Sequence, residues 1–390
     1  MSSFTQSYSI LEYGSMISDR RIDSYVEALK SAILPGAVVL DIGTGTGFFA
    51  VLACQLGAKK VYAIEPDDAI HVARQVAIDN GCADKIEFIQ GISTQVDLPE
   101  RADVIISDLR SVLPLLQHHI PSIADARKRL LAPNGVQIPQ QDTIWVTLIS
   151  DAEYYQKKFR SPWEDAPYGC ILSANRQFVT NTWHKHRFQP EQLLVEPQIW
   201  TTIDYTTVTD PNVSSTLTWT VEQGGTVHGI GVWFDSKLAE AIGFSNAPDK
   251  PQYIYGNAFF PLSNPIELVP SDRVSVTLQA KLIGNDYIWS WYTQVTTNDT
   301  PAKVKASFQQ STLLGMPLLP PTLQMQKRTE TYIPHLSEFA TIDSLILNLM
   351  TEAKPLGEIA HHLTQQFPQR FPSWQKALSY VSAMSQRYCE

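Results

Sequence analysis

The sequence predicts an α/β fold joined to a β-rich domain and a small helical module. Three observations predict it. Between about residues 37 and 148, short apolar strands alternate with helical segments, as is typical of a mostly parallel, doubly wound, Rossmann-like sheet. After about residue 150, Thr, Val, Trp and Tyr alternate with polar residues, as is typical of an antiparallel β-barrel or sandwich. Towards the C-terminus, apolar residues recur at helical spacing.

The α/β domain follows an N-terminal stretch, residues 1 to about 30, that we expect to be helical. The expected strands are Ala37–Ile42, Lys60–Glu65, Ile86–Gln90, Ala102–Ser107 and Asp142–Ile149, and the expected helices are Phe48–Leu56, Asp67–Asn80 and Ile120–Leu131. In a doubly wound sheet, ligands bind at the carboxyl ends of the strands. Gly43, Glu65, Gly91 and Asp108 stand at those ends. We therefore expect one crevice to collect all four residues.

The β-rich part predicts strands within 199–222, 226–234 and 268–297, whereas 152–190 predicts neither helix nor strand clearly. Leu318-Leu319-Pro320-Pro321 predicts a linker. Helices are expected after it at Ile342–Met350, Leu356–Phe367 and Trp374–Tyr388. The expected domains are N-terminal helices over 1–32, the α/β domain over 33–150, the β domain over 151–322 with an arm near 152–190, and the helical module over 323–390.

Composition excludes several classes of partner. The 390 residues carry a net charge of −9 with no block of five basic residues, so we expect no nucleic-acid partner. No apolar run reaches the ~18 residues of a membrane span, and the N-terminus has no secretory signal pattern. The four cysteines form no C-x-x-C pair, and the paired histidines His184/His186 and His361-His362 lack further ligands. We expect neither a metal site nor disulfides, and a cytoplasmic location.

A glycine-rich turn carries the strongest chemical signal. Asp41 ends an apolar strand and is followed by Gly43, Gly45 and Gly47. Alternate glycines let the backbone approach a ligand closely, and G-x-G-x-G differs from the G-x-G-x-x-G of NAD sites. A carboxylate at Asp41 is unfavourable beside a pyrophosphate but favourable beside an ammonium or sulfonium. Glu65, 18 residues beyond Gly47, stands close to the spacing at which an acid binds ribose hydroxyls. Together these features indicate S-adenosyl-L-methionine.

The same segments resemble those of the protein arginine methyltransferases and their bacterial relatives over residues 1 to about 300. The blocks that carry the resemblance are Phe4–Tyr8 with Met16–Asp19, Val39–Gly47, Val61–Glu65, Ala132–Gly135 with Ile138-Pro139, Val232–Asp235, and Asn257–Leu262 before Pro265-Ile266. The resemblance implies a Rossmann-like methyltransferase domain, a β-barrel, and an arm in the barrel that forms a homodimer. It implies S-adenosyl-L-methionine as cofactor, bound by Arg21, Asp41, Gly43, Gly45, Glu65, Ser93 and Thr94. Arg21 falls, with a one-residue gap, where the family's arginine holds the methionyl carboxylate.

The chain departs from this family where the family binds its acceptor. Two glutamates nine residues apart clamp a guanidinium in the family, and Asp108 and Gln117 stand at those positions here, with Arg110 nearby. The family's Thr-His-Trp loop corresponds to Tyr253–Tyr255, so its histidine is missing. A guanidinium facing one acid and an adjacent cation would be poorly neutralised. We therefore expect an acceptor other than arginine, such as the side-chain amide of asparagine.

Three residues are candidates for the chemistry. Methyl transfer is an in-line displacement that depends on placing the acceptor, and a nearby carboxylate, imidazole or phenol can take the acceptor's proton. Asp108 is the first candidate, with a helix or turn cap as the alternative. His118 is the second; it adjoins His119, and at most one of the two would enter a site, a structural or solvated role being the alternative. Tyr13, with Tyr8, could line the acceptor pocket as in the family, or pack in the core.

Three functions remain open at this point. The leading hypothesis is an S-adenosyl-L-methionine-dependent N-methyltransferase that acts on a protein or peptide side chain. The second is a small-molecule methyltransferase of a biosynthetic pathway. The third is a non-catalytic binding protein on the same fold. Leu356–Leu363 resembles the peptide-binding or winged-helix modules of peptide-modifying enzymes. If the module recruits a peptide or protein, this resemblance favours a polypeptide side chain as the methyl acceptor. The alternative is that the segment only packs within the module.

Overall fold

The computed structural model describes residues 8–299, 301–315 and 332–389, and the chain forms two compact units, Met1–Leu318 and Leu319–Glu390. Residues 4–7 of the family-like N-terminal block and the expected linker at 318–321 lie outside the described residues. Within the part of the chain that is described, no helix has both the length and the apolar character needed to cross a bilayer.

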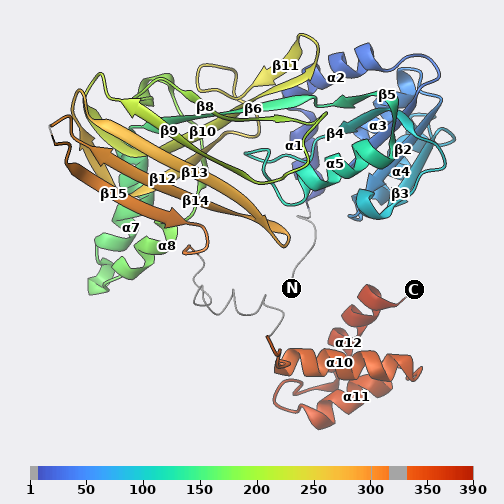
Figure 1. Ribbon diagram of the computed structural model, residues 1–390. Coiled ribbons are helices and arrows are strands. Elements are labelled where there is room, and N and C mark those ends of the chain that lie inside the picture. The colour runs from blue at the N-terminus through green and yellow to red at the C-terminus, as the bar shows by residue number, and fades with distance from the viewer. Residues whose placement is uncertain (1–7, 300, 316–331, 390) are drawn as a thin grey trace. The chain divides into compact units, whose positions relative to one another are not determined.

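The first unit begins with helices α1 (Ile10–Ile17) and α2 (Arg21–Ala32) and a five-stranded parallel sheet (Figure 1). Its strands are β1 (Val38–Ile42), β2 (Lys60–Glu65), β3 (Ile86–Gln90), β4 (Ala102–Ser107) and β5 (Leu131–Ile138), in the order β3-β2-β1-β4-β5. The connecting helices are α3 (Phe48–Gln55), α4 (Ala69–Asp79) and α5 (His119–Arg129), with the short turn η1 (Ser93–Gln95). The strand order reverses between β1 and β4, which is where ligands bind in such sheets.

Both faces of this sheet are covered, because alternate strand residues point to opposite sides. On one face Val39, Val61 and Ile106 pack in the same core as Tyr25 and Leu29 of α2. On the other face, strand residues including Leu40, Ile64 and Ile105 form a second core with residues of α5. The predicted doubly wound α/β fold is confirmed.

One predicted strand belongs to a different sheet. Residues 142–149 were expected to complete the parallel sheet, but β6 (Gln141–Ile149) pairs antiparallel with two barrel strands. The fifth parallel strand is β5, where Ala132-Pro133-Asn134-Gly135 carries turn residues. A proline is tolerated there because β5 is an edge strand. The boundary expected at residue 150 is therefore wrong, since the barrel begins with β6.

The β domain consists of two antiparallel sheets. The six-stranded sheet has the order β7-β12-β10-β6-β8 with β11 beside β10, and the four-stranded sheet has the order β15-β14-β13-β9. The bounds are β7 (His184–His186), β8 (Gln198–Asp204), β9 (Val213–Thr220), β10 (Gly225–Ala239), β11 (Ile242–Ser245), β12 (Asn257–Leu268), β13 (Arg273–Ile283), β14 (Asp286–Thr296) and β15 (Val304–Ser311). The indoles of Trp200 on β8 and Trp289 on β14 pack against each other across the core, with ring centroids 5.7 Å apart and ring planes tilted by 36°.

The arm between β6 and β7 contains helices that the sequence did not predict. They are α6 (Ala152–Tyr155), α7 (Ser161–Glu164) and α8 (Arg176–Thr180), with short turns η2 (Gln156–Arg160), η3 (Pro167–Gly169) and η4 (Ser173–Asn175). Asp151 caps α6 by accepting from Tyr154 N. Tyr168 of η3 and Ile171, which follows η3, are exposed.

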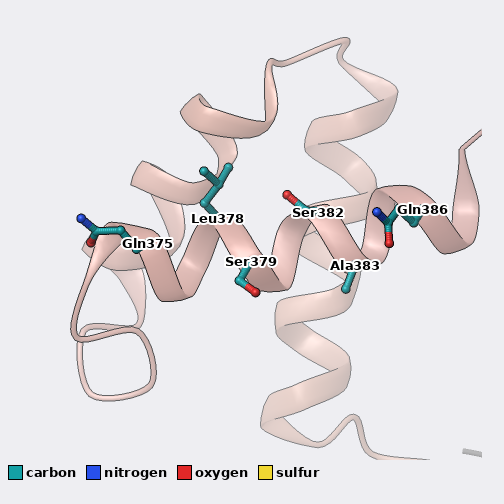
Figure 2. Close-up of a pocket in the computed structure, with 6 residues that line it drawn as sticks. All are labelled: Gln375, Leu378, Ser379, Ser382, Ala383 and Gln386. Atoms are coloured by element: carbon teal, nitrogen blue, oxygen red, sulfur yellow. The ribbon is translucent and has the colours of Figure 1, made fainter.

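Over residues 332–389, the second unit consists of three helices with their own core. Its helices are α10 (Glu338–Thr351), α11 (Leu356–Gln366) and α12 (Trp374–Tyr388). The core includes Ile346, Ile359 and Val381. A hollow of about 510 Å³ lies along α12. Figure 2 labels the six residues that line it, Gln375, Leu378, Ser379, Ser382, Ala383 and Gln386. All six lining side chains are uncharged, and none is among the candidate site residues.

Candidate functional site

The glycine turn joins β1 to α3 in left-handed backbone conformations. Gly43, Gly45 and Gly47 have φ values of +77°, +54° and +87°, a region that glycine enters at no steric cost. A Cβ on Gly45 would lie 2.5 Å from the Tyr13 ring, and a Cβ on Gly43 would lie 2.5 Å from the Leu109 side chain. The turn is therefore a cradle that α1 and the loop after β4 cover closely.

Glu65 ends β2 directly beside this turn and is almost buried, at 7% exposure. Its Oε2 accepts from Gly45 N at 2.9 Å and its Oε1 accepts from Asp67 N at 3.0 Å. Burial raises the pKa of Glu65, and the two backbone donors oppose that rise. Each carboxylate oxygen can accept a further hydrogen bond. A pair of vicinal hydroxyls fits this acceptor.

Asp41 lies on the other side of the turn and is buried, with Oδ2 accepting from Thr44 Oγ1 at 2.6 Å. Burial raises the pKa of Asp41 to about 7, the negative charge of Glu65 adds to the rise, and the Thr44 hydroxyl opposes it. A cation beside Asp41 would favour the ionised carboxylate. The geometry and charge therefore suit an ammonium group.

The remaining predicted cofactor residues lie after β3 and on α2. Ser93 and Thr94 open η1, where Ser93 is buried and its carbonyl accepts from Arg129 Nη2 at 2.9 Å, while Thr94 is exposed. Arg21 opens α2 and is buried. Its guanidinium donates to the Met16 carbonyl at 2.8 Å and is otherwise directed towards protein groups described below.

Asp108 follows β4 and is bound by two guanidiniums and a phenol. Its Oδ2 accepts from Arg21 Nη2 at 2.9 Å, and its Oδ1 accepts from Tyr255 OH at 2.5 Å and from Arg110 Nε at 3.4 Å. Burial alone would raise the pKa of Asp108, but the two guanidiniums and the phenol outweigh burial and lower the pKa to about 2. Asp108 is thus an ionised carboxylate whose charge is already neutralised by the protein.

Arg110 extends this network to the barrel. Its Nη1 donates to Asp142 Oδ1 at 2.7 Å and to Ser236 Oγ at 2.7 Å, and its Nη2 donates to the Tyr25 hydroxyl. Asp142 also accepts from Tyr205 OH at 2.6 Å. The side chains of Arg110 and Asp142 are fully buried. The α/β domain, α2 and the barrel therefore share one ion network of two arginines with Asp108 and Asp142, to which Asp19 adds a third carboxylate through Arg21.

The loop positions that depart from the family have defined partners. Ile254, which replaces the family's histidine, donates its backbone N–H to Asp19 Oδ2 at 2.7 Å. Asp19 also accepts from Arg21 Nη1 at 3.3 Å. Gln117 is half-buried and has a φ of 41°. None of these positions places a second unpaired carboxylate beside Asp108.

The other candidate residues lie outside this network. His118 is exposed and its Nε2 lies 3.0 Å from Asn285 Oδ1 in the β13–β14 turn. Its neighbour His119 is buried against Tyr205, and burial lowers the pKa of His119 to about 4. Tyr13 covers the glycine turn, and burial followed by the charges of Glu65 and Asp67 raises its pKa. Tyr13 therefore stands with the cofactor residues, and His118 with a surface turn.

Sequence patterns did not reveal the partners of Asp108 and Arg110. Tyr255 donates to Asp108, and Arg110 donates to Tyr25, Asp142 and Ser236. These four partners come from separate parts of the chain, and no local spacing connects them. Only Tyr255 carried a signal, through its place in the altered family loop. Among the described residues, no three His, Cys, Asp or Glu side chains are grouped to hold a metal ion.

Comparisons with known proteins agree with this division of the chain. The family model "Ribosomal protein L11 methyltransferase (PrmA)" matches residues 24–139, and "Arginine methyltransferase oligomerization subdomain" matches residues 140–287. The change between the two models falls between β5 and β6, where the barrel begins.

Similar proteins of known name are arginine methyltransferases. The chain is 31% identical over 258 residues to "Probable protein arginine N-methyltransferase 6.1" of Oryza sativa subsp. indica, covering 63% of this chain and 67% of that protein. It is 28% identical over 298 residues to "Protein arginine N-methyltransferase PRMT10" of Arabidopsis thaliana, covering 67% of this chain and 78% of that protein. It spans 65%, 55% and 48% of the length of three other relatives.

Solved structures share the fold. Arabidopsis thaliana protein arginine methyltransferase 10 matches with a TM-score of 0.69 at 24% identity, covering 78% of this chain and 98% of that chain. The Trypanosoma brucei PRMT1 enzyme–prozyme heterotetrameric complex with AdoHcy matches with a TM-score of 0.68 at 23% identity, covering 77% and 96%. The family resemblance expected from the sequence is confirmed: the chain belongs to the protein arginine methyltransferase family of S-adenosyl-L-methionine-dependent enzymes.

Proposed function

We propose that this chain transfers the methyl group of S-adenosyl-L-methionine to a side-chain nitrogen of a protein or peptide, and that this nitrogen carries no positive charge. A side-chain amide such as that of asparagine is an acceptor of this kind. The observation that carries the proposal is the state of Asp108, whose carboxylate contacts two arginines and a phenol.

The residues around the glycine turn fit the cofactor. Glu65 offers two carboxylate oxygens at the end of β2 for the ribose hydroxyls, and Asp41 offers a buried carboxyl for the methionyl ammonium. Gly43 and Gly45 leave the turn without Cβ atoms, and Ser93 and Thr94 begin the segment after β3 that would flank the base. When bound, the cofactor supplies a methyl group on a sulfonium that leaves as a neutral thioether.

Charge decides between acceptors. The carboxylate of Asp108 already contacts the guanidiniums of Arg21 and Arg110. Asp19 and Asp142 pair with the same two guanidiniums. A guanidinium substrate could reach the Asp108 carboxylate only by displacing Arg21 or Arg110, and the displaced arginine would lose a charged partner in a buried site. A neutral amide meets no such penalty.

The basicity of Asp108 supports the same acceptor. With a pKa of about 2, Asp108 is too weak a base to deprotonate a guanidinium or an ammonium before transfer. Transfer of the methyl group to a neutral amide nitrogen forms an N-protonated amide cation, which is strongly acidic, so even a weak carboxylate base can take its proton to give the neutral N-methylamide. Asp108 is the residue that we propose for this step, and Tyr13 for closing the site.

Arginine is the second candidate acceptor. The names of the relatives favour it, since each is described as an arginine N-methyltransferase. For arginine to bind as a clamped guanidinium, Asp108 would have to release Arg21 or Arg110. The family model that matches residues 140–287 describes an oligomerization subdomain, which supports a homodimer formed through the arm, where Tyr168 and Ile171 are exposed.

The hydrolysis of labelled protein separates the two acceptors. The chain would be incubated with cell extract and tritiated methyl donor, and protein bands would be hydrolysed in acid. An N-methylamide breaks down to volatile methylamine, whereas methylarginine survives acid and stays non-volatile. The proposal predicts volatile label that is absent with a Glu65→Ala control. Label recovered as methylarginine would contradict it, and label confined to small metabolites would favour a small-molecule methyltransferase.

A further inference from the structure

Arg110 fills a site built for a guanidinium. Its Cζ lies 5.5–5.9 Å from the centroids of four aromatic rings, within the range in which a cation is attracted to a ring face. The rings are those of Tyr25, Phe234, Phe244 and Tyr255. Two carboxylates, Asp108 and Asp142, complete the enclosure. We name these six residues the arginine cage.

The cage and the proposed acceptor site share two members. Asp108 and Tyr255 contact Arg110 on one side and Arg21 on the other. The charge on Asp108 is therefore divided between internal arginines before any substrate arrives. An incoming guanidinium would have to compete with a side chain that is tethered two residues away and already desolvated.

We propose that Arg110 determines acceptor specificity by serving as the internal counter-ion of Asp108, so that a cationic acceptor side chain is excluded. The inference rests on the proposed function, because it explains how the same site comes to accept a neutral nitrogen. Arg110 is fully buried, so it acts through Asp108 as a positioning residue.

A purely structural role is the competing explanation. Arg110 joins the loop after β4 to β6, β10 and α2 through Asp142, Ser236 and Tyr25. A structural role predicts that replacing Arg110 changes stability alone. A specificity role predicts that the preference between charged and neutral acceptors changes as well, and this preference is the quantity to measure.

The test uses two peptides that differ in one side chain. One carries arginine and the other carries citrulline, which has nearly the same shape but is neutral. Binding of each to the full chain would be titrated in the presence of S-adenosylhomocysteine. The proposal predicts that the wild type binds the citrulline peptide more tightly.

The informative variant is Arg110→Met with Asp142→Asn, which removes one positive and one negative buried charge together. It leaves Asp108 paired with Arg21 alone. The affinity for the arginine peptide relative to the citrulline peptide should rise about 10- to 100-fold, the worth of one charge-assisted hydrogen bond. Asp142→Asn alone keeps Arg110 on Asp108, so its affinity for the arginine peptide relative to the citrulline peptide should not rise above that of the wild type.

An unchanged relative affinity in the double variant, with S-adenosylhomocysteine affinity retained, would overturn the role of Arg110. Should the double variant not fold, Arg110→Gln keeps neutral donors towards Asp142, and its relative affinity should shift in the same direction; no shift would again overturn the proposal. A wild type that favours the arginine peptide would refute the neutral acceptor. If the wild type favours the arginine peptide and the double variant favours it still more strongly, that result would still support Arg110 as the residue that opposes cationic acceptors.

Discussion

Cofactor affinity should depend on pH through Asp41. Burial raises the pKa of this carboxyl from 3.8 to about 7 in the cofactor-free protein. Asp41 therefore takes up a proton as the pH falls below about 7. An ammonium placed beside it favours the carboxylate, so binding in that range must expel the proton. Affinity should fall as the pH falls.

The size of the effect follows from the shift. If the bound form requires ionised Asp41, the apparent affinity falls tenfold for each pH unit below about 7 and levels off above it. Between pH 8 and pH 5 the loss is about 100-fold. Each mole of ligand bound near pH 5.5 should release close to one mole of protons, and near pH 8.5 close to none.

Calorimetric titration with S-adenosylhomocysteine between pH 5.5 and 8.5, in buffers of different ionisation enthalpy, measures both affinity and proton release. Asp41→Asn should bind more weakly than the wild type at pH 8 and should lose the pH dependence. A wild-type affinity that stays flat from pH 8 to pH 5.5, with no proton release, would refute the position assigned to Asp41.

Three further substitutions test the site. Glu65→Ala should weaken S-adenosylhomocysteine binding about 10²- to 10⁴-fold, because two ribose hydroxyls lose a charged acceptor. The control Glu87→Ala, at an exposed position of β3, should leave the affinity unchanged. Equal affinity of the two variants would show that Glu65 does not bind the ribose. Asp108→Asn should lower the free energy of unfolding in urea at pH 7 by about 3–5 kcal/mol, because two guanidiniums lose their carboxylate. The control is Asp97→Asn, which removes an acid whose side chain is 97% exposed and should lower the free energy of unfolding by less than about 0.5 kcal/mol. The pKa of Asp108 in the folded protein lies below 3.8, so its contribution to the free energy of unfolding is present above about pH 4 and is lost as the pH falls towards 2. If the difference in unfolding free energy between the wild type and Asp108→Asn did not change with pH over that range, the ion pair would be contradicted. Gly45→Ala should lower Tm, because alanine is strained at a φ of +54° and its Cβ meets the ring above the turn; an unchanged Tm would mean that the turn is not held in this conformation.

The sequence predicted the fold best where local patterns suffice. The bounds of β2, β3, β4 and α12 match the predictions, because an apolar run or a helical repeat ends there at turn or cap residues. β5 was missed because Pro133 and Asn134-Gly135 read as a turn, although an edge strand tolerates them. β6 was expected in the wrong sheet, since a strand's pattern does not say which strand it pairs with.

The same limit applied to the site. Glu65 and the glycines stand within one βαβ unit, so their proximity could be expected from spacing alone. The position of Asp108 at the crevice was expected, but the sequence could not predict which residues contact it. Tyr255 reaches it across 147 positions of the chain, and Asp142 meets Arg110 across 32. Contacts of that range depend on how the barrel packs on the α/β sheet, which no local pattern encodes.

A crystal structure of the chain with S-adenosylhomocysteine tests the central claim most directly. The account predicts ribose hydroxyls on the Glu65 carboxylate and Asp108 still held by Arg110 with the nucleoside in place. Arg110 turned away, with the Asp108 carboxylate open towards the sulfur, would contradict it.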